Sequence, residues 1–301
     1  MKQSDQIVQV LLHEQIRVIA IAGGEMVEEA RKIHGLSRVV TAALGRQMMA
    51  TAMMSAQLKH ESESLTTIIK GDGPVGNLVC TGRFGAKVKA YAANPDVELP
   101  LRENGKLDVR GAVGKAGKLT VIRDLSLREP YVGECNLVTG EIAEDFAQYF
   151  TASEQTPSLV YLGVRVNPID GIVRAGGGII AQPLPGCAEE YIDELQYRAQ
   201  EIGSLSLRLD EGETLTNALY GIFAGMEISV VGTSTPLWEC DCSRARTERA
   251  LIAIGQEELT DMIEKDGGAE LSCQFCNTMY QFNKEELTVL LLEAGGRIDA
   301  R

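Results

Sequence analysis

Residues 236–282 read PLWECDCSRARTERALIAIGQEELTDMIEKDGGAELSCQFCNTMYQF, and two cysteine pairs frame most of this stretch. The first pair is Cys240-Asp241-Cys242, and the second is Cys273-Gln274-Phe275-Cys276, after thirty intervening residues. Zinc takes four ligands in a tetrahedron, and thiolates suit it well. The paired spacing therefore predicts one zinc site with four thiolate ligands: Cys240, Cys242, Cys273 and Cys276.

The residues between the pairs predict a helical hairpin. Arg244–Ile254 and Glu257–Lys265 have helical patterns joined at Gly255, and Asp266-Gly267-Gly268 turns the chain back toward Cys273. Such a hairpin brings its ends together, so both cysteine pairs can reach one metal ion. Histidine ligands are not expected, because all the histidines lie in the first part of the chain: His13, His34 and His60.

The zinc site has two chemically reasonable roles. A closed four-cysteine site usually holds a small domain together, and structural zinc contributes roughly 10–16 kcal/mol of apparent folding free energy. Zinc also keeps its ligands as thiolates, the form that oxidants attack, so oxidation would remove that stabilisation. From this chemistry alone, the zinc can be either purely structural or part of a redox switch.

Composition narrows the class of protein. The chain has 301 residues, 45% of them hydrophobic, which is enough for one large domain and a small one. No apolar run approaches the roughly 18 residues of a membrane helix, and charges interrupt the N-terminal stretch, so we expect a cytoplasmic protein without membrane association. The net charge of −13 disfavours nucleic-acid binding.

The first part of the chain has the pattern of an α+β fold with antiparallel-type sheets. Helices are expected over Glu25–His34, ending at Gly35, from Ser37 to about Lys59, and over Ile142–Thr151. Strands are expected where short apolar runs alternate with Gly and Asn turns: Leu65–Lys70, Val75–Thr81, Lys87–Ala92, Lys118–Arg123, Tyr131–Val138, Ser158–Val166 and Ile172–Gln182. The order is not a regular βα alternation, which argues against a doubly wound sheet.

A change of composition after Pro183, Pro185 and Gly186 suggests a domain boundary. Between Cys187 and Val230 there are nine acidic residues and two basic ones. Two amphipathic helical patterns fit this segment, which reads either as a helical linker of modest stability or as an ordinary docked subdomain. We therefore expect a core domain over residues 1–186, an acidic helical linker over 187–235 and a zinc domain over 236–301.

Both cysteine motifs resemble the zinc centre of the heat shock protein 33 family of redox-regulated chaperones. The resemblance extends to Asp261–Gly267 and to Tyr280-Gln281-Phe282. It also reaches the first domain in stretches that follow in the same order: Ala43–Arg46, Gly71–Pro74, Ser153–Ser158 and Ala175–Gly178. It covers nearly the whole chain.

The resemblance implies a non-enzymatic function. The family's reduced, zinc-bound form is idle, and oxidation forms two disulfides, carried over here as Cys240–Cys242 and Cys273–Cys276, with release of one zinc per chain. The zinc domain and linker then unfold, oxidised chains dimerise, and unfolding client proteins are held without ATP. The acidic linker lies where the family's unstable linker lies.

Two alternatives remain for the cysteine motifs. One is a zinc-ribbon binding protein with a purely structural metal, and the other is a thiol oxidoreductase that uses Cys273-Gln274-Phe275-Cys276. Gly71–Gly76 matches a dinucleotide-binding pattern, but a strand-like run follows it, so we interpret it as a hairpin turn.

Several other residues have simple structural interpretations. Cys80 and Cys135 read as buried strand residues, whereas Cys187 is a candidate for exposure. The methionines of the long helix suit either an adaptable client surface or, more simply, core packing: Met48, Met49, Met53 and Met54.

Overall fold

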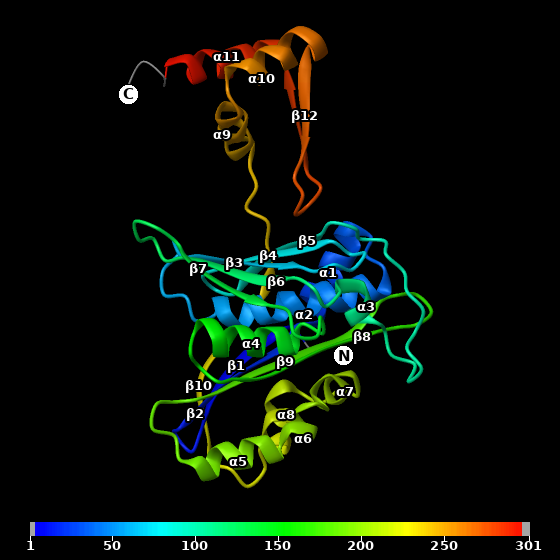
Figure 1. Cartoon of the computed structure of the whole chain (residues 1–301), viewed down its shortest axis with the longest axis vertical. Helices are drawn as coiled ribbons and strands as arrows, with labels where there is room; N and C mark the ends of the chain where they lie inside the picture. Colours follow the sequence, from blue (N-terminus) through cyan, green and yellow to red (C-terminus); the bar gives the residue numbers. More distant parts are fainter. Residues whose placement is uncertain (1–3, 297–301) are drawn as a thin grey trace. The chain divides into compact units, whose positions relative to one another are not determined.

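The computed structural model describes residues 4–296, and the chain divides into two compact units between Glu239 and Cys240 (Figure 1). Both units combine helices with antiparallel strands, so the expected α+β class with antiparallel-type sheets is confirmed. The expected division into three parts at residues 186 and 235 stays a prediction. Within residues 4–296, no helix is both long enough and apolar enough to span a membrane.

The N-terminal unit contains two sheets. The first has the order β10-β1-β2-β9-β8 and is antiparallel throughout. Its strands are β1 (Gln6–Leu12), β2 (Ile16–Ala22), β8 (Leu159–Val166), β9 (Val173–Pro183) and β10 (Ile228–Ser234). The first two strands and β10 do not appear in the sequence-based assignment.

The second sheet has the order β11-β5-β4-β3-β6-β7. Its strands are β3 (Ser64–Lys70), β4 (Asn77–Arg83), β5 (Lys87–Ala92), β6 (Lys118–Asp124), β7 (Tyr131–Asn136) and β11 (Leu237–Trp238). All neighbours are antiparallel except the short β11, which runs parallel to β5. The glycine-rich stretch Gly71–Gly76 connects β3 to β4, which confirms the hairpin turn predicted there.

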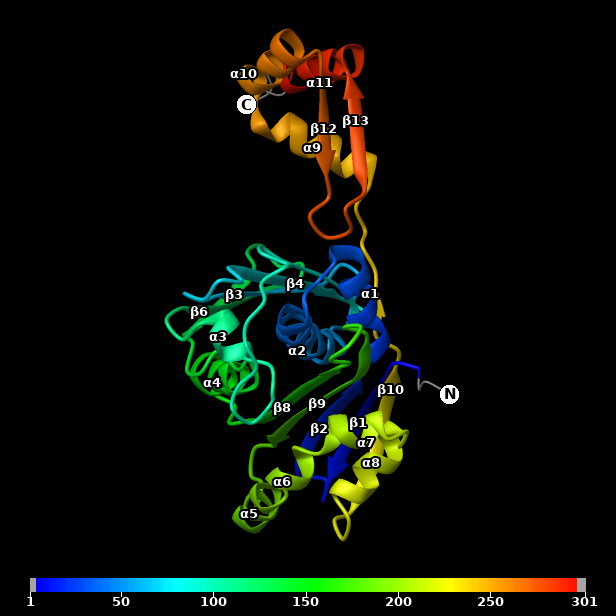
Figure 2. The same cartoon turned by 90° about the vertical axis from the view of Figure 1, so that its right-hand side faces the viewer.

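Helix α2 (Arg38–Ser55) lies between the two sheets (Figure 2). Ser37 caps it, because its hydroxyl accepts a hydrogen bond from the Val40 amide, as predicted. Nearly every residue of α2 is buried, and its methionines are at most 1% exposed, so core packing explains them: Met48, Met49, Met53 and Met54. The helix ends at Ser55 rather than near Lys59, where the Glu63 carboxylate accepts the amides of Lys59 and His60 instead.

Three shorter helices complete the packing around α2. Helix α1 (Gly24–His34) ends at Gly35, whose left-handed φ of 60° is the C-cap that glycine adopts without steric cost. Helix α3 (Val109–Val113) packs against α2, and α4 (Ala143–Ser153) packs against β7 and β8. Together with both sheets they enclose the larger core of the unit.

A second core lies on the opposite face of the first sheet. Four helices cover that face, namely α5 (Glu189–Tyr197), α6 (Ala199–Ile202), α7 (Leu205–Asp210) and α8 (Leu215–Ile222). Their buried leucines and isoleucines pack on Val8, Val10 and Leu12 of β1. The segment expected to be a helical linker is thus helical and docked on the sheet. Leu205 is fully buried, whereas Leu207 is 41% exposed.

Candidate metal centre

The C-terminal unit is a helical pair, a two-stranded hairpin and a closing helix. Helix α9 (Arg244–Ile254) has the predicted bounds, and Gly255 separates it from α10 (Gln256–Asp261), which continues as the wide turn η1 (Met262–Asp266). Strands β12 (Gly268–Ser272) and β13 (Met279–Asn283) pair antiparallel, and α11 (Lys284–Gly296) follows. Asn283 and Glu286 exchange side-chain-to-amide hydrogen bonds and so form a capping box at the start of α11.

The two cysteine pairs come from different local structures. Cys240 and Cys242 precede α9, whose first turn is capped by the Ser243 hydroxyl accepting the Arg246 amide. Cys273 and Cys276 lie in the turn that connects β12 to β13. The Cys273 carbonyl accepts the amides of Cys276 and Asn277, so the turn curls back and presents both thiols on one side.

The four sulfur atoms form one cluster. The Sγ atoms of Cys240, Cys242, Cys273 and Cys276 lie within 4.8 Å of one another. Cys240 Sγ is 3.7 Å from Cys273 Sγ, and Cys242 Sγ is 3.3 Å from Cys276 Sγ. These separations are far beyond the roughly 2.05 Å of a disulfide. Four thiolates around one zinc at about 2.3 Å would lie about 3.8 Å apart, so the cluster has the dimensions of a tetrahedral zinc site.

Hydrogen bonds surround the sulfurs. The Tyr280 hydroxyl donates to Cys242 Sγ at 3.1 Å, and the Thr278 hydroxyl lies 3.2 Å from Cys276 Sγ. The bond to Cys242, together with burial, raises the pKa of Tyr280 to about 12, so its hydroxyl remains a donor at neutral pH. Such outer-shell donors orient thiolates and reduce their excess charge.

Without a metal, the thiols titrate differently from one another. Burial raises the pKa of Cys240 well above its usual range, and burial also raises the pKa of Cys273. Burial opposes ionisation of Cys276 too, but hydrogen bonds from Thr278 and neighbouring thiols outweigh it and lower its pKa to about 7. A divalent cation would favour the thiolate form of every ligand, because each negative sulfur would face a positive ion.

The other cysteines lie away from this cluster. Cys80 on β4 is fully buried, and burial raises its pKa to about 12, so it stays a thiol. Cys135 on β7 is 8% exposed, and burial likewise raises its pKa to about 11. Cys187 is partly buried at the edge of the second core, where its thiol lies 3.5 Å from the Ala188 carbonyl. The buried interpretation of Cys80 and Cys135 is confirmed.

The position of the Cys-x-x-Cys motif weighs against an oxidoreductase. Enzymes of that kind place the motif after a strand at the N-terminus of a helix, where the helix dipole stabilises the thiolate. Here Cys273-Gln274-Phe275-Cys276 occupies a hairpin turn, and β13 follows it. The motif therefore lacks the helix N-terminus that activates the thiolate in such enzymes.

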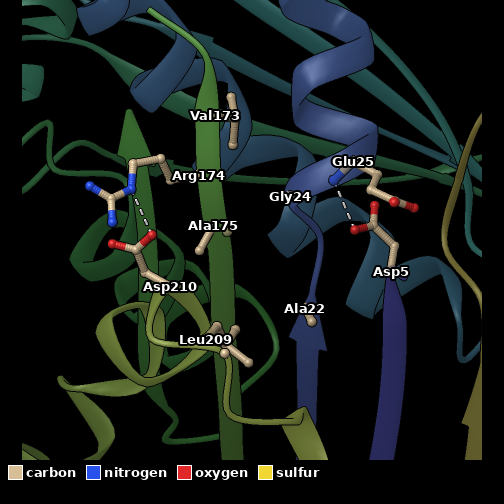
Figure 3. Close-up of a pocket in the computed structure, with 11 residues that line it drawn as sticks. Asp5, Ala22, Gly24, Glu25, Val173, Arg174, Ala175, Leu209 and Asp210 are labelled. Carbon is tan, nitrogen blue, oxygen red and sulfur yellow. Dashed lines mark hydrogen bonds and ion pairs between the residues drawn. The ribbon is translucent and has the colours of Figure 1, made fainter. Parts of the chain in front are cut away.

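One cavity of the N-terminal unit, lined by both charged and apolar residues, was not indicated by the sequence. It measures about 170 Å³ and lies between the start of α1, strand β9 and the end of α7 (Figure 3). The Asp5 carboxylate accepts the amides of Glu25 and Met26, and Asp210 pairs with Arg165 and Arg174. Burial raises the pKa of Asp5 to about 6, although its two amide partners oppose the shift.

Comparison with known proteins agrees with these features. The family model described as Hsp33 protein matches residues 5–283. The 33 kDa chaperonin of Clostridium beijerinckii is 46% identical over 276 residues, covering 92% of this chain and 94% of that protein. The 33 kDa chaperonin of Clostridioides difficile is 43% identical over 279 residues, covering 93% and 95%.

A solved structure extends the likeness to three dimensions. The crystal structure of the 33 kDa chaperonin (heat shock protein 33 homolog) from Thermotoga maritima aligns with a TM-score of 0.86 at 36% identity. The alignment covers 97% of this chain and 99% of that chain. From the extent of the family match, the identities and the shared fold, this chain belongs to the Hsp33 family of chaperones.

Proposed function

We propose that this chain is a redox-regulated, ATP-independent holdase that zinc keeps inactive and that oxidation activates. The observation that carries the proposal is the convergence of four thiols within 4.8 Å in a small unit of an Hsp33-family chain. One zinc ion bound by Cys240, Cys242, Cys273 and Cys276 would join α9 to the β12–β13 turn.

Zinc would stabilise a unit that has a small core of its own. That core consists of a few apolar residues on α9, α10, η1, β13 and α11. Structural zinc supplies about 10–16 kcal/mol of apparent folding free energy, which is large beside the 5–15 kcal/mol stability of a whole domain. Removal of the ion should therefore unfold the C-terminal unit.

Oxidation provides the means of removal. When peroxide oxidises a pair of thiolates, one S–S bond forms, the O–O bond breaks, and two protons from solvent leave with the oxygens as two water molecules. We propose the pairs Cys240–Cys242 and Cys273–Cys276 from the family resemblance alone. The sulfur separations of 3.7 Å and 3.3 Å join Cys240 to Cys273 and Cys242 to Cys276, so the geometry does not carry this pairing. A disulfide sulfur is a poor zinc ligand, so the ion would dissociate.

Activation would follow from the loss of docked structure. Release of the α5–α8 layer, which packs on the first sheet, would expose the apolar face of that sheet to unfolding clients and to a second oxidised chain. The nine acidic residues between Cys187 and Val230 would keep the released segment in solution. The cytoplasm, where thiols stay reduced until oxidative stress, is the compartment that suits this cycle.

Zinc release and client protection should be followed together. The zinc-loaded protein is treated with hypochlorite, or with peroxide at mildly raised temperature, and liberated zinc is recorded with a chromogenic chelator. Light scattering of a thermally unfolding client is recorded in parallel. We expect zinc release and suppression of aggregation to rise together and to reverse with a thiol reductant.

Two results would contradict the proposal. Zinc release without any gain in client protection would make the site a structural staple, and catalytic turnover of a disulfide substrate would favour an oxidoreductase. The matched control is Cys80→Ser/Cys135→Ser/Cys187→Ser, which keeps the four-thiol cluster and should respond as the native chain does. Mass spectrometry of proteolytic peptides tests the disulfide pairing directly.

A further inference from the structure

Strand β10 is weakly held at the edge of the first sheet. It bonds only to β1 within that sheet, and none of its residues is buried. Val230 and Val231 are 48% and 56% exposed, and the ladder is interrupted by a register shift opposite Gln9 and Val10. An edge strand with little buried side-chain area is among the first elements of a sheet to separate.

Strand β1 is held much more firmly than its partner. It forms a continuous seven-residue ladder with β2, and its side chain Ile7 is fully buried. Ile7 belongs to the core around α2, which involves neither β10 nor the α5–α8 layer. If β10 departs, β1 should remain in the sheet with its outer edge unpaired.

The outer edge of β1 offers an alternating row of amides and carbonyls. The His13 amide donates to the Glu227 carbonyl at 2.9 Å at one end of the ladder. Because bonded pairs alternate along an antiparallel ladder, the next bonded pair is Leu11 with Ser229, which face each other. Without β10 these groups would seek another extended chain, as unpaired edges do.

The present occupant of this edge has the chemistry of an unfolded client segment. Strand β10 reads ISVVGTS, an extended and uncharged sequence with three β-branched apolar residues. We propose that β10 is an internal pseudo-client, and that after its release the edge of β1 binds extended apolar segments of unfolding proteins by strand addition. Backbone pairing recognises no particular sequence, which suits a chaperone with varied clients.

This inference rests on the proposed function and adds a docking mode to it. The apolar face covered by α5–α8 lies beside the same strand, since Val8, Val10 and Leu12 of β1 belong to the second core. A client strand on β1 would therefore place alternate side chains next to newly exposed apolar surface. The edge would supply backbone pairing, and the face would supply apolar contacts.

Two proline substitutions, one on each strand of the same bonded pair, distinguish the role of β10 from the role of the β1 edge. Proline lacks an amide proton and blocks strand pairing on its side. Ser229→Pro should release β10 but leave the edge of β1 intact, so client protection by the reduced protein should increase severalfold. Leu11→Pro should release β10 as well, yet it damages the edge itself, so client protection should be lost even after oxidation.

Control variants isolate the amide from the side chain. Ser229→Ala and Leu11→Ala keep both amides and should behave like the native chain, apart from a small loss of stability for Leu11→Ala. Circular dichroism and zinc release are measured for every variant. If both prolines raise client protection, β10 release alone matters and strand addition to β1 is wrong, while the proposed redox cycle stands.

Cross-linking covers the case in which Leu11→Pro does not fold. A photoreactive amino acid replaces Gln9 on β1 in one protein and Val132 on the distant edge strand β7 in another. With a thermally unfolding client, we expect the Gln9 probe to capture client after oxidation and the Val132 probe to capture little. Equal capture at both positions, or capture of only a second copy of this chain at Gln9, would overturn the inference.

Discussion

The two units of this protein obtain their stability in different ways. In the N-terminal unit, helix α2 is buried on nearly all sides between two sheets, and its core needs no bound group. In the C-terminal unit, a small apolar core lies beside four thiols whose sulfurs meet at one point. Burial responds to heat and denaturant, whereas the proposed metal–thiolate bonds would also respond to oxidants and chelators, so we expect oxidation to unfold the C-terminal unit before the N-terminal one.

Loss of the metal should produce the largest difference between the units. Cys273→Ser removes one of the four proposed ligands, and we expect the C-terminal unit to lose most of the roughly 10–16 kcal/mol that structural zinc supplies. Hydrogen exchange should show β12, β13 and α11 unprotected while β3 and β4 stay protected. Full protection of β12 and β13 in this variant would show that the apolar core suffices without the metal.

Truncation of a side chain in the larger core should have the opposite effect: it should destabilise the N-terminal unit and leave the C-terminal unit unchanged. Met53→Ala leaves a cavity beside α2, where Met53 is fully buried, and should lower the unfolding free energy of the N-terminal unit by about 2–5 kcal/mol. Zinc retention should be unchanged. The matched control is Met279→Ala, at a residue that is 49% exposed, which should cost less than about 0.5 kcal/mol. Zinc loss in Met53→Ala would contradict the independence of the two units.

The buried Asp5 carboxyl should give the N-terminal unit a distinctive pH dependence. Its pKa of about 6 lies above the ordinary 3.8, so between these values the folded chain holds a proton that the unfolded chain releases. The stability that this group contributes is therefore fully present below pH 3.8 and is lost as pH rises through about 6. Relative to Asp5→Asn, the native chain should gain on the order of 2–3 kcal/mol between pH 7 and pH 4. Unfolding free energies are measured with denaturant for both proteins at each pH. A difference between the native chain and Asp5→Asn that stays constant from pH 7 to pH 4 would refute this prediction.

Loss of a single hydrogen bond to one of the cluster sulfurs should have the smallest effect, a modest decrease in zinc affinity. Tyr280→Phe removes the hydroxyl that donates to Cys242 Sγ and should weaken zinc binding about tenfold, the lower end for outer-shell partners because Tyr280 is partly exposed. Competition with a chromogenic chelator measures this ratio. Tyr220→Phe, at an exposed tyrosine of α8, serves as the control and should leave zinc affinity unchanged.

Much of the local structure was predictable because its signals are local. The bounds of β5 and α9 agree with the sequence patterns, and the caps form at Gly35 and Ser37, where one helix was expected to end and the next to begin. Alternation of buried and exposed residues marks strands such as β3 and β5. Capping depends on residues within one turn of the helix end, so sequence alone identifies it.

Other elements carry no such local signal. Strand β2 is buried at nearly every position because helices cover both faces of its sheet, so its sequence IRVIAIA lacks the alternation of a half-buried strand. Strand β11 has only two residues and exists through its pairing with β5. The expected extension of α2 to Lys59 does not form, and the carboxylate of Glu63 accepts the amides of Lys59 and His60.

The amino-acid sequence by itself determined the four-cysteine motif, the helical hairpin between its pairs and the family resemblance, because ligand spacing and helical periodicity are properties of the chain. Only the tertiary structure decided which strands are neighbours, that α5–α8 docks on the first sheet, and that β10 lies against β1. Those arrangements bring together residues more than 200 positions apart, such as Leu11 and Ser229. Their free energy comes from surfaces buried jointly, which no single segment of the sequence contains.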